Sequence, residues 1–196
     1  MNLPNKISVV RICMIPVFVL FFYLTAVPYH HVIAAVIFAA AALTDLLDGR
    51  IARSRGLVTN LGKFLDPIAD KVLVATAFVL MLTTENIFGL FGNWCYIAGA
   101  LLVCLILARE LIISAFRQIA AASGLVLAAE KLGKYKTTFQ DVCIFVLIFS
   151  ADFAGTAGKV LNGIGLALFA VAVVLTVWSG FSYVLKNKQV LKDTAH

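Results

Sequence analysis

Apolar stretches of membrane-spanning length recur along this chain and constrain its fold more than any other feature. A transmembrane helix needs about 20 consecutive, mostly apolar residues. Charged residues make up 13% of the chain, whereas a soluble domain usually carries about 25%. The predicted spans are 7–27, 32–51, 67–84, 94–119, 137–154 and 160–183. We therefore expect an all-α integral membrane protein with six transmembrane helices.

The connections between the predicted spans are short, which indicates a single domain over residues 1–196. No linker rich in Ser, Pro or Gly and no block of charges divides the sequence. No convincing small-residue cleavage site follows the first apolar stretch. We expect that stretch to be retained as a helix and not removed as a signal peptide.

The basic residues are distributed unevenly over the predicted connections. Of the 16 Lys and Arg residues, all except Lys159 lie near the termini or beside the second-to-third and fourth-to-fifth connections. By the positive-inside rule, both termini and these two connections face the cytoplasm. The net charge of +6 favours contact with anionic membrane lipids. Because the positive charge is scattered over separate loops, we do not expect nucleic acid as a partner.

Four of the ten acidic residues lie between Asp45 and Asp70, at the cytoplasmic edge of the second and third predicted spans. Asp45 and Asp48 are three residues apart and Asp66 and Asp70 are four apart, so on helices each pair lies on one face. Converging carboxylates repel one another unless a cation lies between them. Carboxylates suit Mg²⁺ or Mn²⁺, and Mg²⁺ commonly shares its coordination shell with substrate phosphates. The pattern therefore predicts a site where one or two divalent ions hold phosphate groups.

Residues beside the aspartates fit a phosphate ligand. Gly49 and Gly62 would let a ligand approach the backbone closely, and Arg53 supplies a planar cation of the kind that pairs with diphosphate. Two alternative interpretations explain fewer of the four aspartates than a metal–phosphate site does. Asp66 could cap the helix that follows it, but this does not explain the earlier aspartate pair. A divalent-cation transporter would normally place its carboxylates near the bilayer midplane, on broken helices.

The aspartate run follows the pattern D-x-x-D-G-x-x-A-R, eight residues, then G-x-x-x-D-x-x-x-D, from residue 45 to residue 70. This run resembles the signature of the CDP-alcohol phosphotransferase family at every fixed position. The resemblance implies a six-helix membrane fold, a homodimer and a centre with two Mg²⁺ or Mn²⁺ ions. It also implies that the ions hold the diphosphate of a CDP-linked lipid while an alcohol attacks the β-phosphorus and CMP leaves.

The resemblance further implies a role for each matched residue. Asp45, Asp48 and Asp66 would be metal ligands. Asp70 would bind metal and would also be the catalytic general base that takes the proton from the acceptor hydroxyl. The residues expected to bind CDP-diacylglycerol are Asn5, Ser8, Gly49, Ala52, Arg53, Thr59 and Gly62.

Two other segments, 2–11 and 108–140, resemble bacterial phosphatidylglycerophosphate synthases of that family. The resemblance implies sn-glycerol 3-phosphate as the acceptor and the bacterial inner (cytoplasmic) membrane as the location, with the active site cytoplasmic. Glycerol 3-phosphate is a dianion near neutral pH, so its site needs cations. The expected acceptor phosphate-binding residues are Arg109, Arg117, Lys134 and Lys136. Alternatively, these cations only satisfy the positive-inside rule and extend to lipid headgroups, and Glu110 simply pairs with Arg109.

Within the family, the main competing function is cardiolipin synthesis, in which phosphatidylglycerol is the acceptor. That site would have to admit a second diacyl lipid and would need less positive charge. Outside enzymes, the competing class is the divalent-cation transporter considered above.

The remaining candidate metal ligands, His and Cys residues, lie outside the aspartate run. His30 and His31 lie in a predicted connection without Lys or Arg. A histidine pair can bind a metal ion, but a solvated loop at the membrane interface is the favoured interpretation. The cysteines have no ligand-type spacing and are expected to pack within or near helices. They are Cys13, Cys95, Cys104 and Cys143.

Overall fold

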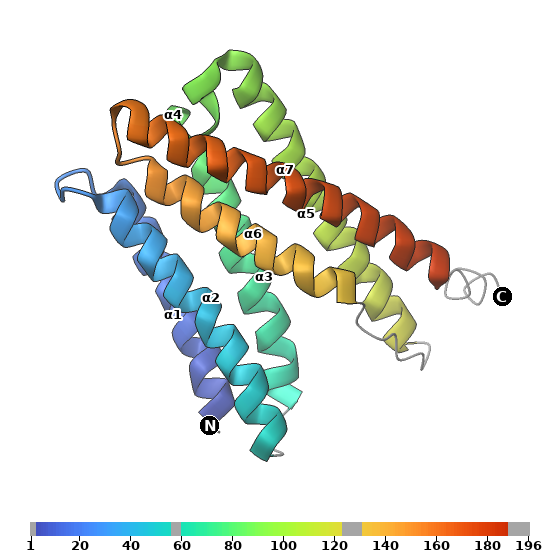
Figure 1. The fold of residues 1–196 in the computed structure, drawn as a ribbon. Coiled ribbons are helices and arrows are strands. Elements are labelled where there is room, and N and C mark those ends of the chain that lie inside the picture. The colour runs from blue at the N-terminus through green and yellow to red at the C-terminus, as the bar shows by residue number, and fades with distance from the viewer. Residues whose placement is uncertain (1–2, 56–59, 123–130, 188–196) are drawn as a thin grey trace.

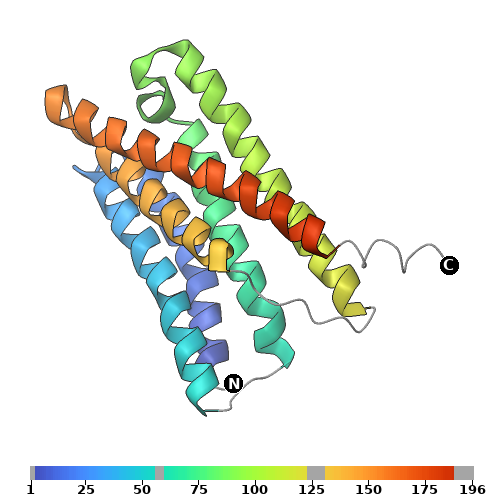
Figure 2. The same ribbon diagram turned by 45° about the vertical axis from the view of Figure 1, so that its right-hand side comes forward.

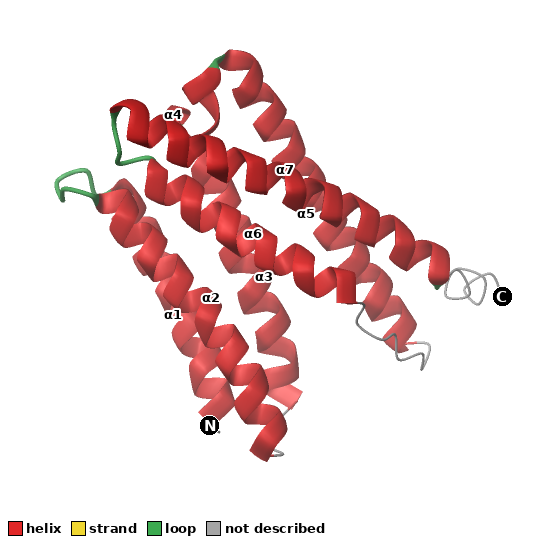
Figure 3. Cartoon of the chain, viewed as in Figure 1, coloured by secondary structure: helices red, strands yellow, loops and turns green. Residues whose placement is uncertain are grey.

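The computed structural model describes residues 3–55, 60–122 and 131–187, and its side chains are described over 8–44, 68–121 and 133–187. These residues are helical throughout, apart from short connections, and form no strand (Figure 3). In chain order, the elements are α1 (Leu3–Tyr23), α2 (His30–Arg55), α3 (Asn60–Leu82), α4 (Glu85–Phe88), the 3₁₀ turn η1 (Gly89–Phe91), α5 (Asn93–Ala122), α6 (Lys131–Ser150) and α7 (Gly155–Lys186) (Figure 1). The all-α prediction is confirmed for this part of the chain.

Each predicted span falls on one long helix, but α3 begins earlier than predicted. Its first residue is Asn60, about two turns before Pro67. The prediction placed Pro67 at the first helical position, where a missing N–H costs nothing. Asp66 therefore lies inside the helix, and the interpretation of Asp66 as a helix cap is wrong.

The short segment after α3 was not predicted as structured. The chain bends by 84° between Ile68–Leu82 and Glu85–Phe91, and α4 and η1 lead back toward the bundle. Phe88 is 1% exposed and its ring lies 5.3 Å from the ring of Phe169. A Cβ on Gly99 would come within 2.5 Å of the Phe88 ring, so only glycine lets this segment pack so closely on α5.

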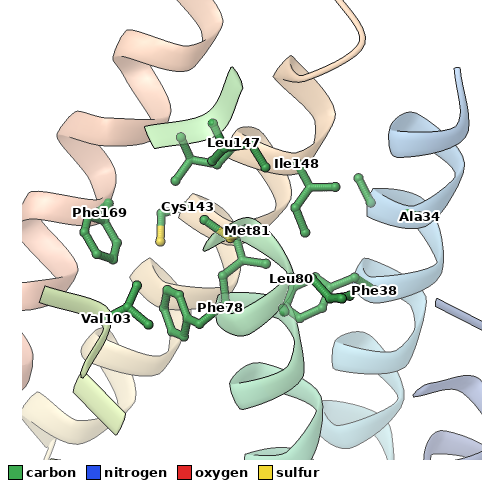
Figure 4. Close-up of a cluster of buried hydrophobic side chains, with 14 of the residues drawn as sticks. Ala34, Phe38, Phe78, Leu80, Met81, Val103, Cys143, Leu147, Ile148 and Phe169 are labelled. Atoms are coloured by element: carbon green, nitrogen blue, oxygen red, sulfur yellow. The ribbon is translucent and has the colours of Figure 1, made fainter. Parts of the chain in front are cut away.

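The buried core joins all six long helices and α4, and Figure 4 shows the part of it between α2, α3, α5, α6 and α7. At its centre Phe78 lies 6.0 Å from Phe169, ring centre to ring centre. Gly165 brings α7 close to α6, because a Cβ there would be 2.7 Å from a methyl carbon of Leu147. Cys143 is buried in this core, as its predicted packing role requires.

Two of the described helices are long and apolar enough to cross a membrane, Asn93–Ala121 in α5 and Gly155–Lys186 in α7. If the bent pair of α3 and α4 is counted as one broken span, the number of candidate membrane spans rises to three. Shorter apolar helices occupy Ser8–Tyr23 and His30–Thr44. The described part of the chain thus contains membrane-length helices, while six crossings remain a prediction.

The helices alternate in direction, so their ends form two groups (Figure 1, Figure 2). The start of α1, the end of α2 and the start of α3 lie toward one end of the bundle, together with the end of α5, the start of α6 and the end of α7. We call this end the basic end, after Lys71, Arg109, Arg117, Lys134 and Lys136. The opposite end carries the connections α1–α2 and α6–α7.

Candidate active site

Helices α2 and α3 contact each other and bring the aspartate run to the basic end. Asp45 and Asp48 lie in the last three turns of α2, and Asp66 and Asp70 lie in the first three turns of α3. Asp70 is half-buried. The side chains of the other three aspartates lie outside the described residues, so their metal-binding role remains a prediction.

Most of the predicted CDP-diacylglycerol residues also lie outside the described side chains. Gly49, Ala52 and Arg53 are on α2, and Asn5 and Gly62 are on α1 and α3. Thr59 lies in the connection that the structure does not describe. Ser8 is the exception, because its side chain is described and fully buried on α1.

A cavity of about 230 Å³ lies between α3, α5 and the start of α6. Asp70 lines it, together with all four residues predicted to bind the acceptor phosphate. The complete lining is Asp70, Lys71, Arg109, Glu110, Ile113, Ser114, Arg117, Gly133, Lys134, Lys136 and Thr137. The fold therefore brings together a carboxylate and several cations that are separated by up to 66 positions in the sequence.

Glu110 is the anionic centre of this cavity. Arg109 Nη1 lies 3.1 Å from Glu110 Oε1, which confirms the expected pair. Lys136 Nζ donates to the same oxygen. Lys136 is only 5% exposed, so it does not extend to lipid headgroups as the alternative required. Burial lowers the pKa of Lys136, and the nearby Glu110 and Asp70 carboxylates oppose that shift.

Arg109 also fastens α5 to α7. Its Nε donates to the Thr176 carbonyl oxygen at 3.1 Å, and Nη2 donates to Ser179 Oγ at 2.9 Å. A Cβ on Gly180 would lie 2.9 Å from Arg109 Nε, so this glycine leaves room for the guanidinium. Three of the five N–H donors are occupied, counting the one to Glu110, and the other two have no partner among the described residues.

Arg117 and Lys134 are exposed, in contrast to Lys136. Arg117 Nε lies 3.1 Å from the Tyr183 hydroxyl, and its guanidinium carbon is 5.0 Å from the centre of that ring. Tyr183 is itself buried against Phe116. Arg117 is thus positioned by α7, whereas the exposure of Lys134 agrees with the lipid-headgroup alternative.

Three polar contacts near this site were not predicted from the sequence. Lys71 Nζ donates to Ser114 Oγ, which donates to the Glu110 carbonyl oxygen at 2.6 Å. From the sequence, Lys71 served only to predict the membrane topology, although it follows Asp70 directly in the chain. Arg11 is fully buried, and its Nε lies 3.4 Å from Thr44 Oγ1, one residue before the aspartate run. The signal for Arg11 was its i+3 spacing from Ser8, which places both on one helix face.

Membrane-length helices, with a carboxylate and basic residues gathered around one cavity, are the features of an enzyme that handles anionic substrates at a membrane surface. The sequence model of the CDP-alcohol phosphatidyltransferase family matches residues 1–178. This chain belongs to that family and is a transferase.

Three relatives that match over more than nine-tenths of both chains carry the same name, CDP-diacylglycerol–glycerol-3-phosphate 3-phosphatidyltransferase. The protein of that name from Bacillus subtilis (strain 168) is 36% identical over 98% of both chains. The one from Escherichia coli (strain K12) is 40% identical, again over 98% of both chains. The one from Pectobacterium atrosepticum is 39% identical over 93% of this chain and 92% of its own.

Proposed function

We propose that this protein transfers the phosphatidyl group of CDP-diacylglycerol to sn-glycerol 3-phosphate, giving phosphatidylglycerol phosphate and CMP. The names of the relatives support this reaction. The observation that carries the proposal is the cavity in which Asp70 and the four candidate acceptor residues meet.

The charges of the cavity suit a dianionic acceptor. Its lining contains five cations, Lys71, Arg109, Arg117, Lys134 and Lys136, and two anions, Asp70 and Glu110. Five minus two leaves an excess of three positive charges, before any bound metal is counted. Phosphatidylglycerol carries a single negative charge and two acyl chains, so the excess favours glycerol 3-phosphate over the cardiolipin-type acceptor.

The four aspartates are the proposed ligands of Mg²⁺ or Mn²⁺, with two ions in each site. The donor set fits such ions, because it consists of hard carboxylate oxygens carried at the same end of two contacting helices. When bound, the divalent ions would offset the negative charge of the diphosphate. Arg53, Gly49 and the other predicted CDP-diacylglycerol residues would then line the nucleotide side of the site.

Asp70 is the proposed general base. The acceptor hydroxyl oxygen forms a bond to the β-phosphorus, the bond from that phosphorus to the CMP oxygen breaks, and the hydroxyl proton passes to Asp70. Two facts support this assignment. Asp70 lines the acceptor cavity, and its carboxylate is close enough to Lys136 to act on the pKa of that residue.

The wider arrangement follows from the same proposal. All six long helices would cross the bacterial inner membrane, with the basic end and both termini in the cytoplasm, and the chain would act as a single domain and as a homodimer. The helix lengths of 20 to 32 residues and the clustering of cations at one end support the crossings and the orientation.

The direct test is CMP release by the purified protein in detergent micelles supplied with CDP-diacylglycerol. We expect release with glycerol 3-phosphate and Mg²⁺ or Mn²⁺, and none when the acceptor is omitted. Release with phosphatidylglycerol but not with glycerol 3-phosphate would assign cardiolipin synthesis. No release under any condition would refute the enzymatic function.

The base assignment is tested by Asp70→Asn, which keeps the shape of the side chain and removes the proton acceptor. We expect turnover to fall by about 10²- to 10⁴-fold while substrate binding persists. Glu85→Gln is the matched control, since Glu85 is an exposed carboxylate at the start of α4. A near-normal rate in Asp70→Asn would contradict the assignment.

A further inference from the structure

A second group of metal-ligating side chains lies at the end of the bundle opposite the candidate active site. His30 and His31 begin α2, and Asp152 follows α6, 121 residues away from His31. Figure 1 shows the α1–α2 and α6–α7 connections on the same side of the molecule. Each of the three residues offers a ligand atom, and these atoms all lie within 4.8 Å of one another.

The hydrogen bonds of His31 fix its tautomer. Its Nδ1 lies 2.7 Å from Asp152 Oδ1, and an ionised carboxylate can only accept, so Nδ1 carries the proton. The other oxygen, Oδ2, accepts from the Val32 backbone N–H at 2.9 Å and holds the carboxylate in place. The lone pair of His31 is therefore on Nε2. A carboxylate that orients a histidine in this way is the usual support of a metal-binding imidazole.

His30 is oriented by a backbone carbonyl. Its Nδ1 lies 3.0 Å from the Phe22 oxygen, which is also only an acceptor, so its lone pair too is on Nε2. The two imidazole rings are 4.0 Å apart, centre to centre, and tilted by 37°. In the neutral form of each ring, the nitrogen available to a metal is therefore Nε2.

We propose that His30 and His31 bind a divalent transition metal ion such as Zn²⁺ through their Nε2 atoms, with Asp152 as the residue that orients His31. Imidazole ligands prefer Zn²⁺, Cu²⁺ or Ni²⁺, whereas Mg²⁺ prefers oxygen. This site is therefore chemically distinct from the proposed four-aspartate site. Water completes the coordination, so the site is open and of moderate affinity.

The surroundings favour the neutral imidazole that a metal needs. The side chains of His31 and Asp152 are 13% and 9% exposed. Burial lowers the pKa of His31, and its hydrogen bond to Asp152 partly opposes that change. The ring of His31 also packs edge-on against Phe22 at 5.0 Å, which limits its rotation. An ion bound here would hold the α1–α2 connection against the α6–α7 connection through the His31–Asp152 pair.

The test is calorimetric titration of Zn²⁺ into the chelator-stripped protein in detergent with excess Mg²⁺, which keeps carboxylate sites occupied. All variants carry Cys95→Ser, so that this thiol cannot bind the added metal ion. Cys95 is exposed on α5, near the end of the bundle that holds the histidine pair. We expect one Zn²⁺ per chain. His30→Gln and His31→Gln should each weaken binding at least tenfold, and Asp152→Asn by about 10-fold or more. His196→Gln, at the third histidine of the chain, is the matched control and should bind as the parent does.

A second measurement uses the protein with both histidines intact, so its result does not depend on whether the histidine variants fold. Cu²⁺ bound to the Cys95→Ser protein should give an electron paramagnetic resonance spectrum with coupling to two imidazole nitrogens. Coupling to one nitrogen or none would overturn the proposal, as would equal Zn²⁺ affinity in the parent and in both histidine variants. None of these readouts depends on CMP release, so failure here is separate from failure of the proposed transferase activity.

Discussion

Replacing Lys136 with methionine removes the buried cation of the acceptor cavity while keeping most of its side-chain volume. Lys136 is 5% exposed, and Arg109 Nη1 contacts the same Glu110 oxygen at 3.1 Å. Glu110 therefore keeps one partner when Lys136 is lost. We expect an unfolding free energy lower by about 1–3 kcal/mol, below the ~3–5 kcal/mol typical when a buried charge loses its only partner.

The effect on acceptor binding should be of similar size and selective for that substrate. A charge-assisted hydrogen bond contributes about 1.5–3 kcal/mol, which corresponds to roughly 10- to 150-fold in binding. Lys136→Met should therefore raise the KM for glycerol 3-phosphate by about that factor and leave the KM for CDP-diacylglycerol nearly unchanged. Both constants come from initial rates of CMP release, each with the other substrate saturating.

The matched control is Lys159→Met, which removes an exposed lysine from the opposite end of the bundle. It should change neither constant. Equal increases in both KM values for Lys136→Met would place Lys136 outside the acceptor site. An unchanged KM for glycerol 3-phosphate, in a variant whose thermal unfolding is only mildly shifted, would refute the cationic role of the cavity.

Three other outcomes test the site. Because burial lowers the pKa of Lys136, its proton is lost at a pH below the usual lysine range. The acceptor KM should therefore rise with pH before that range is reached, and a pH series of initial rates should show this rise in the parent and not in Lys136→Met. Gly180→Ala places a Cβ 2.9 Å from Arg109 Nε and should raise the KM for the acceptor. In the control Gly163→Ala, on the same helix, the new Cβ lies 4.0 Å from its nearest neighbour. This control should leave the acceptor KM unchanged and add up to about 1 kcal/mol to the unfolding free energy, measured by calorimetry. Chelation should abolish CMP release, and Mg²⁺ or Mn²⁺ should restore it; activity that survives chelation would refute metal dependence.

The long helices could be predicted because an apolar run of about 20 residues has few alternatives to a helix in or beside a membrane. The segment of α4 and η1 could not, because seven residues are too short to display a helical period. What holds that segment is the contact of Phe88 with Gly99 and Phe169, and none of these contacts is visible in local sequence.

The candidate site was predictable to a similar extent. The aspartate run and the four acceptor cations stood out through charge, spacing and family resemblance. The double role of Glu110 did not, because it depends on α6 placing Lys136 beside α5 across 26 residues of sequence. Asp152 gave no signal as a partner of His31 for the same reason, since their pairing exists only once α2 and α6 are packed together.

Under the proposed function, the anchoring of Arg109 on α7 separates a residue that contacts the acceptor from the residues that determine where it lies. Thr176, Ser179 and Gly180 carry no part of the aspartate signature, yet they set the position of a guanidinium in the acceptor cavity. If Arg109 binds the acceptor as proposed, substitutions at these three positions would change acceptor preference while every signature residue stays the same. A library that randomises these three positions, selected for growth on different acceptor alcohols, would explore specificity without touching the catalytic carboxylates.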